Sequence, residues 1–158
     1  MKAVIQRVKH AKVDVDGKTV GQIGEGYMIL VGVMEGDTEN EAETLARKTA
    51  NLRVFTDDED KMNLSILDVD GEVLAISQFT LCADVKKGNR PSFINSAAPD
   101  EANRLYEYYC SKLLENGVKK VEKGIFGEHM EVSLLNNGPV TILYDTDIWC
   151  GRGVSYVG

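Results

Sequence analysis

Histidine, the side chain most often used as a general base or a metal ligand, is scarce in this sequence of 158 residues. There are two histidines, His10 and His129, and neither stands in an H-E-x-x-H or similar spacing. A Ser-His-Asp triad would have to use one of them. The sequence also lacks a G-x-S-x-G elbow, a Walker loop and a dinucleotide-binding glycine pattern. We therefore predict no metal and no cofactor.

Cysteine pairs and long apolar runs are missing as well. Cys82, Cys110 and Cys150 include no C-x-x-C pair, which is typical of reduced thiols rather than of a disulfide framework or a zinc site. No apolar run approaches the roughly 18 residues of a membrane span, and the N-terminus lacks a secretory signal. We expect a soluble cytoplasmic protein with no membrane partner. We also expect one domain over residues 1–147 and a glycine-rich tail over 148–158.

Positive charge is outnumbered, since the formal net charge is −7. This argues against a protein that binds nucleic acid by general electrostatic attraction. The basic residues nevertheless gather in three groups. Each group alone is also explained as part of an ordinary solvated surface, but together on one fold the three could form a local phosphate-binding face. The groups are Lys2, Arg7, Lys9 and Lys12; Lys86, Lys87 and Arg90; and Lys119, Lys120 and Lys123.

The pattern of the first third of the sequence favours β-strands. Alternating segments around residues 4–8 and 13–15 precede the apolar run 27–33, which suits a buried strand. Asp16-Gly17 is a strong hairpin signal, because both turn residues tolerate positive φ. Asp70-Gly71 repeats it before residues 73–76, so we predict two hairpins. Three further strands are expected at 119–125, 130–135 and 140–144.

Two helices are predicted among these strands. Thr38 and Glu41 have the spacing of a capping box ahead of apolar residues at helical intervals. The second helix begins near Pro99 and ends at Gly117, which suits the left-handed residue that closes a helix. Strands and helices do not alternate regularly enough for a doubly wound parallel sheet. We predict a single α+β domain with a curled, barrel-like, mostly antiparallel sheet and two main helices.

Two polar stretches interrupt the expected strands. Ser77-Gln78-Phe79-Thr80 is explained either by local hydrogen bonds at a strand end or by a strand end whose polar groups converge on a ligand. The stretch 136–139, which ends in Gly138-Pro139, is explained either as a turn or as a rigid backbone recognition element. The pattern alone leaves both alternatives open in each case.

Several segments resemble those of D-aminoacyl-tRNA deacylases, in that family's order along the chain. The resemblance covers residues 1 to about 145, and several separate motifs are more specific than any single one. Glu128-His129 and Asn137 depart from the residues usual in the family, but neither position is assigned to chemistry. The similar segments are Leu52–Phe55, Lys61–Ser65, Ser77–Leu81, Gly88–Phe93, Gly124–Gly127 and Asn137–Thr141.

The resemblance implies hydrolysis of the ester bond of D-aminoacyl-tRNA, and of mischarged glycyl-tRNA, by a homodimer that binds the 3′ end of the tRNA. Main-chain N–H groups at Ser77, Gln78, Phe79 and Thr80, above all that of Phe79, would form an oxyanion hole. A water oriented by the 2′-hydroxyl of the terminal adenosine would attack. DNA lacks this hydroxyl and is not an expected partner.

The resemblance also implies how the chain would select one enantiomer. A cis Gly138-Pro139 bond would project into the pocket of the other subunit, where an L-side chain would strike its backbone. Arg7 resembles the family residue that helps to hold this loop, and Met130 is expected in the same substrate site. The basic group of Lys86, Lys87 and Arg90 is the expected tRNA contact.

Three alternatives remain open. Thr80 could act as a nucleophile, although the sequence offers no nearby histidine or lysine as its base. Cys82 could serve as the nucleophile of a thiol hydrolase. The same strand-end site could also bind an aminoacyl-tRNA end without hydrolysing its ester.

Overall fold

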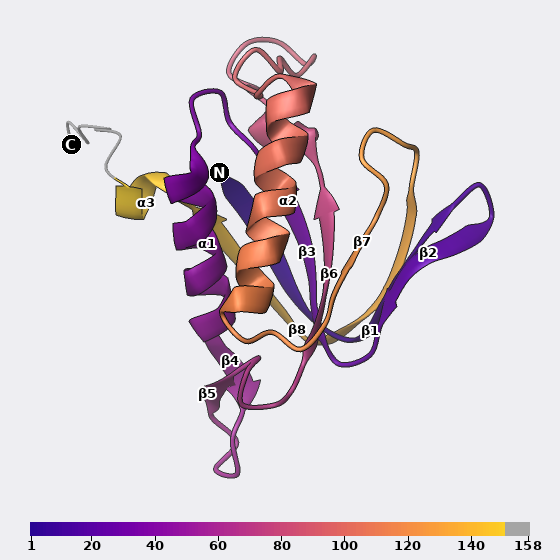
Figure 1. Ribbon diagram of the computed structural model, residues 1–158, viewed down its shortest axis with the longest axis vertical. Helices are drawn as coiled ribbons and strands as arrows, with labels where there is room; N and C mark the ends of the chain where they lie inside the picture. The colour runs from indigo at the N-terminus through magenta and orange to yellow at the C-terminus, as the bar shows by residue number, and fades with distance from the viewer. Residues whose placement is uncertain (151–158) are drawn as a thin grey trace.

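A computed structural model describes residues 1–150 of the chain. Its main sheet has the strand order β2-β1-β3-β6-β7, with β8 paired to β1, and a separate hairpin is formed by β4 and β5 (Figure 1). The elements are β1 (Lys2–Val15), β2 (Lys18–Ile23), β3 (Gly26–Gly32), α1 (Glu39–Asn51), β4 (Arg53–Thr56), β5 (Met62–Ser65), β6 (Glu72–Ser77), the 3-10 helix η1 (Phe79–Cys82), α2 (Pro99–Glu115), β7 (Val121–Lys123), β8 (Glu131–Asp145) and α3 (Asp147–Cys150).

Strand β1 organises the sheet. Its first half pairs with β3, its second half pairs with β2, and its opposite edge pairs with β8 over almost its whole length. The sheet curls until β2 approaches β7, where a Cβ built on Gly21 would lie 2.8 Å from the carbonyl oxygen of Lys123. The result is a nearly closed, barrel-like sheet. The predicted α+β class is confirmed.

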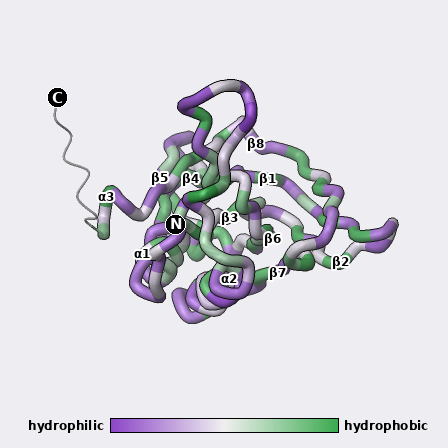
Figure 2. The backbone as a smooth tube through the Cα atoms, turned by 90° about the horizontal axis from the view of Figure 1, so that it is seen from above, coloured by the Kyte–Doolittle hydropathy of each residue, from purple (hydrophilic) through white to green (hydrophobic). Residues whose placement is uncertain are grey.

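Both long helices cover the same face of this sheet (Figures 1 and 2). Helix α1 begins at the predicted capping box, in which the Thr38 and Glu41 side chains and backbones bond reciprocally. Helix α2 has Pro99 in its first turn, and Gly117 takes a φ of +106° just after its end. Their apolar sides meet alternate residues of β1, β3 and β6 in the main core.

The opposite face of the sheet holds a smaller apolar cluster. It contains buried residues of β1, β2, β3 and β6, and the partly buried Met130, Val132 and Leu134 pack against it. This cluster lies inside the curl, so the sheet covers it with its own strands. The buried members are Val8, Ala11, Val13, Ile23, Met28, Leu74 and Ile76.

One predicted hairpin is confirmed and the other is wrong. Asp16 and Gly17 have φ values of 50° and 77° and connect the antiparallel strands β1 and β2. Asp70 also has a positive φ of 51°, but the strand after it, β6, pairs in parallel with β3. Gly71 instead packs closely on Ile66, where a Cβ would lie 2.6 Å from the Ile66 side chain.

The C-terminal part of the sheet also differs from expectation. The two strands predicted at 130–135 and 140–144 are one strand, β8, which runs through Gly138-Pro139 without a turn. The register of β8 on β1 shifts between Gln6 and Val8 and again between Val8 and His10, and these irregularities accommodate the interruption. The strand predicted at 119–125 is shorter and covers only Val121–Lys123.

Residues 147–150 form the short helix α3. The Trp149 ring packs edge-on against Tyr144, with 4.8 Å between the ring centroids, and the Lys48 ammonium group lies 5.4 Å from the Trp149 ring. Residues 151–158 of the expected tail lie outside the described residues. Among the helices of residues 1–150, none is both long enough and apolar enough to cross a membrane.

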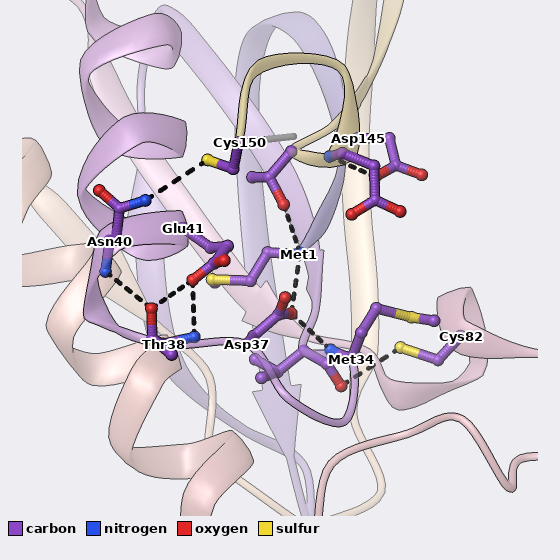
Figure 3. A network of polar contacts seen from close by, with 12 residues as sticks. Met1, Met34, Asp37, Thr38, Asn40, Glu41, Cys82, Asp145 and Cys150 are labelled. Carbon is purple, nitrogen blue, oxygen red and sulfur yellow. Dashed lines mark hydrogen bonds and ion pairs between the residues drawn. The ribbon is translucent and has the colours of Figure 1, made fainter. Parts of the chain in front are cut away.

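The α-amino group of Met1 lies in a buried polar network (Figure 3). Its nitrogen is 2.8 Å from Asp37 Oδ2, and both partners are at most 1% exposed. The amino group also donates to Thr146 Oγ1 at 2.7 Å, and the same Asp37 oxygen accepts from the Met34 N–H at 2.7 Å. This network joins the start of β1, the loop before α1 and the end of β8.

We predict that Asp37→Asn lowers the free energy of unfolding by about 3–5 kcal/mol, because it leaves the buried ammonium group without its counter-charge. Urea unfolding followed by circular dichroism measures the change. The matched control is Glu59→Gln, which removes an ion pair with Lys61 whose side chains are 77% and 73% exposed. The control should unfold like the original chain. Equal urea midpoints for both variants would contradict the role of Asp37 as the counter-charge of the buried α-amino group.

Candidate functional site

Ser77-Gln78-Phe79-Thr80 lies where β6 ends beside β3. Ser77 is the last residue of β6 and pairs with Val31, and the Gln78 N–H donates to the Val31 carbonyl at 2.8 Å. Tyr106 of α2 donates its hydroxyl to the Ala75 carbonyl at 2.6 Å, which holds β6 just before its end. The chain then turns into η1 instead of continuing the sheet.

The start of η1 presents backbone N–H groups that its own turn does not use. The first N–H groups of any helix have no partner within that helix. Gln78 occupies the N-cap position but makes no side-chain capping bond, and its amide nitrogen donates to the Thr80 hydroxyl instead. Phe79 and Thr80 are both exposed. The site therefore offers donors from the backbone at Phe79 and Thr80.

An aromatic pair adjoins these donors. The Phe79 ring, 55% exposed, meets Phe93 edge-on with 4.9 Å between the ring centroids. Ile94, next to Phe93, is 76% exposed. Phe93 is not one of the predicted site residues, although it ends the segment Gly88–Phe93, which resembles the family. The resemblance of this segment to the family was the sequence signal that could have identified Phe93.

The basic group at 86–90 lies on a loop between η1 and α2. Asp84 and Ser92 close this loop through two backbone hydrogen bonds of 2.7 and 2.9 Å, and the loop projects beyond the start of α2 in Figure 1. Lys86, Lys87 and Arg90 are exposed and form no ion pair within residues 1–150. The loop thus carries positive charge that the described part of the protein does not neutralise.

The basic group at 119–123 differs in this respect. The Lys123 ammonium group lies 2.7 Å from Glu107, and that of Lys120 lies 3.8 Å from Glu122 and 4.0 Å from Glu72. Carboxylates therefore offset these two charges. Of the two groups, the loop at 86–90 is the better candidate to meet phosphate.

Gly138-Pro139 lies in β8, where both residues are exposed and their peptide bond is cis. Arg7 of β1 lies behind them and is only 9% exposed. Its Nε donates to the Asn137 carbonyl at 2.9 Å, and its Nη1 donates to the Val54 carbonyl at 2.6 Å. A Cβ on Gly138 would lie 3.1 Å from Arg7 Nη2. The guanidinium group thus links this part of β8 to the β4–β5 hairpin.

Met130 stands just before β8 and is half-buried. It packs against the smaller apolar cluster and lies beside Gly124, where a Cβ would be 2.4 Å from the Met130 sulfur. Gly124 therefore leaves the space that the Met130 side chain occupies. Met130 is not among the residues that bond to Ser77–Thr80 or to Arg7.

The structure keeps the two predicted parts of the site apart within one chain. Ser77 pairs with Val31, Val31 pairs with Ala3, and Ala3 pairs with Tyr144, so Ser77 is level with Tyr144 three strands away. Pro139 lies five residues further along β8. With roughly 4.8 Å between strands and about 3.3 Å per residue, the two stretches are about 20 Å apart measured along the sheet.

Cys82, which follows the site in the sequence, is poorly placed to act as a nucleophile. Cys82 is 1% exposed and its S–H group donates to the Val33 carbonyl at 3.4 Å. Burial raises the pKa of the Cys82 thiol, so it stays protonated and inaccessible, which disfavours the thiol-hydrolase alternative. Within residues 1–150, no three histidine, cysteine or acidic side chains lie close enough together to hold a metal ion.

Two hollows of about 540 and 350 Å³ lie elsewhere on the described chain. The larger is lined by His10, Ile23 and Lys120 among others, and the smaller lies between Glu35, Asn95 and Asp147. Neither includes Ser77–Thr80 or Gly138-Pro139.

Comparison with known sequences decides the family. Residues 4–145 match the family described as D-Tyr-tRNA(Tyr) deacylase. The chain belongs to this family. D-aminoacyl-tRNA deacylases of a Geobacter species and of Caldicellulosiruptor bescii are 56% and 55% identical to it over 146 residues, which are 92% of this chain and 97% of each relative. The family expected from the sequence motifs is confirmed.

Solved structures agree with this fold. A protein described as c-Myc DNA Unwinding Element Binding Protein is 39% identical, with a TM-score of 0.87 over 92% of this chain and 98% of that one. A probable eukaryotic D-amino acid tRNA deacylase is 18% identical, with a TM-score of 0.77 over 90% of this chain and 97% of that one. At this lower identity the likeness concerns the fold alone.

We predict that Arg7→Met lowers the free energy of unfolding by about 2–4 kcal/mol, because the Asn137 and Val54 carbonyls lose a charged donor. Hydrogen exchange at residues 136–141 should accelerate as well. Urea unfolding and exchange mass spectrometry measure the two effects. Arg53→Met is the control, since Arg53 also donates to a carbonyl, that of Asn63 at 2.9 Å, but is exposed. Unchanged exchange in Arg7→Met would argue against a supporting role.

Proposed function

We propose that this chain hydrolyses the ester bond of D-aminoacyl-tRNA and releases the free D-amino acid and tRNA. The start of η1 carries this proposal, because its backbone N–H groups at Phe79 and Thr80 are donors without a partner in their own helix. Family membership and relatives that bear the name D-aminoacyl-tRNA deacylase support it.

In the proposed reaction, the oxygen of a water molecule attacks the ester carbonyl carbon. The tetrahedral intermediate places negative charge on the former carbonyl oxygen, and the N–H group of Phe79 stabilises this oxyanion. One such donor contributes roughly a hundred- to a thousand-fold in rate. The bond to the 3′-oxygen of the terminal adenosine then breaks, and that oxygen takes the proton that the water gives up.

The proposed proton path uses the substrate rather than a side chain. The 2′-hydroxyl of the adenosine orients the attacking water, which requires RNA and excludes DNA as a substrate. A Thr80 nucleophile is the second candidate. It needs a base, but the partner found for the Thr80 hydroxyl is the Gln78 amide nitrogen, which is a donor. The water mechanism is therefore the better supported of the two.

We further propose that the functional unit is a homodimer with two shared sites. A single aminoacyl ester is too short for the path of about 20 Å along the sheet from η1 to Gly138-Pro139 of the same chain. Gly138-Pro139 of one subunit would instead reach η1 of the other. Strand β8 suits an interface, since beyond β1 it has no neighbour among the strands described, and it exposes Leu135 and Leu143 at 47% and 73%.

Selectivity in this proposal comes from rejection. The exposed backbone of Gly138-Pro139 would face the α-amino group and leave space for hydrogen or a D-side chain, whereas an L-side chain would collide with it. Glycine has no side chain to reject, so mischarged glycyl-tRNA is a further proposed substrate.

The proposed tRNA contact is the loop that carries Lys86, Lys87 and Arg90. Its charges are not neutralised by the described residues and adjoin η1 in the sequence. Phosphates near the 3′ end would meet this loop, which gives local affinity despite the net charge of −7. The proposed place of action is the cytoplasm, where aminoacyl-tRNA is made and consumed.

A paired assay of D-tyrosyl-tRNA and L-tyrosyl-tRNA tests the function. We expect release of free tyrosine from the D-ester and no release above the spontaneous rate from the L-ester. Equal rates on both esters would refute the chiral selection. Release from neither would favour a binding module that holds the tRNA end without hydrolysing it.

We expect Thr80→Ala to retain most of its deacylation rate, within about three-fold, because the N–H group at this position survives the substitution. Single-turnover hydrolysis of D-tyrosyl-tRNA measures the effect. Phe79→Pro is the comparison, since it removes the backbone N–H group that is assigned to the oxyanion, and it should lose roughly a hundred-fold or more. Complete loss in a folded Thr80→Ala protein would instead support the Thr80 nucleophile.

A further inference from the structure

Helix η1 rests directly on the end of β3. Gln78 bonds to the Val31 carbonyl, and Leu81 and Cys82 then turn back over the next residue of β3, which is Gly32. Gly32 is buried. The position of η1 relative to the sheet is thus set by what lies at the end of β3.

Gly32 has no room for a side chain. A Cβ at this position would lie 2.9 Å from Leu81 Cβ, 3.2 Å from Cys82 Sγ and 3.3 Å from the Gln78 carbonyl oxygen. Leu81 Cβ and the Gln78 carbonyl oxygen belong to the backbone or lie next to it, so side-chain rotation does not relieve these two contacts. The φ of Gly32 is not in the left-handed region, so space and not backbone conformation requires glycine here.

The strand beneath η1 is held on both sides. Gly32 pairs with Lys2 of β1, and β3 is held between β1 and β6. Cys82 is anchored on the next residue through its bond to the Val33 carbonyl. Any added atom at Gly32 therefore has to lift η1, together with the N–H groups at Phe79 and Thr80.

We infer that Gly32 is a positioning residue for deacylation: it lets η1 lie at the depth at which its N–H groups meet the developing oxyanion. This inference rests on the proposed function. Gly32 touches neither the substrate nor the reacting atoms and acts only through η1. A displacement of a catalytic group by about 1 Å costs on the order of a hundred-fold in rate.

The test compares Gly32→Ala with Gly24→Ala. Gly24 also lies outside the left-handed region, and a Cβ there would meet only Glu72 Oε1 at 3.5 Å, an ordinary contact. On D-tyrosyl-tRNA, Gly32→Ala should lower kcat by roughly ten- to a hundred-fold with little change in KM. Gly24→Ala should keep the original kcat. In amide NMR spectra, the shifts caused by Gly32→Ala should centre on residues 77–82.

A relief variant separates positioning from a general loss of fold. Gly32→Ala combined with Leu81→Gly removes the Cβ at 2.9 Å, and its kcat should return to within a few-fold of that of Leu81→Gly alone. If Gly32→Ala alone does not fold, the kcat of the double variant is still compared with that of Leu81→Gly. Original kcat in a folded Gly32→Ala protein, or no recovery in the double variant, would overturn the inference. Absence of hydrolysis by the unaltered chain would instead contradict the proposed function.

Discussion

The pairing of β1 along both edges is the constraint on which the rest of the structure depends. One edge is shared by β2 and β3, which join different halves of the strand, and the other edge is taken by β8. A strand with such partners has to bend, and the bend curls the sheet. The curl encloses the smaller apolar cluster, while α1 and α2 cover the outer face. Arg7 in the first half of β1 then meets Asn137 of β8 at a fixed place.

The candidate site depends on the same sheet but uses its backbone more than its side chains. Strand β6 ends beside β3, and the chain folds over Gly32 into η1. Strand β8 carries Gly138-Pro139 at the other side of β1. Both stretches expose main-chain groups. This suits a site in which one stretch stabilises negative charge and the other distinguishes the configuration of the substrate's α-carbon.

Local signals in the sequence predicted much of the fold. Asp16-Gly17, the Thr38 capping box and Pro99 each depend on neighbours within a few residues, and each is found as predicted. The hairpin predicted at Asp70-Gly71 was wrong because the strand after it pairs in parallel with β3, 46 residues earlier. Nothing local encodes that choice, since parallel pairing is decided by the packing of distant segments.

The candidate site was predictable to a similar extent. The sequence identified the strand end at Ser77 and the Gly-Pro pair, and the structure shows their surroundings. The sequence could not reveal that Gly138-Pro139 interrupts one continuous strand, because this depends on how β8 pairs with the distant strand β1. Nor could it reveal the Val54 carbonyl as a partner of Arg7, since any residue supplies a carbonyl. The space requirement at Gly32 likewise appears only when η1 is seen against β3.

The distance of about 20 Å between η1 and Gly138-Pro139 has a genetic consequence. If two chains exchange these elements, each site draws one element from each chain. A chain damaged at η1 and a chain damaged at Gly138-Pro139, when paired, concentrate both defects in one site and leave the other site intact. With random pairing, about half of the dimers are mixed and each keeps one of its two sites, so two individually inactive alleles would together restore about a quarter of the full activity.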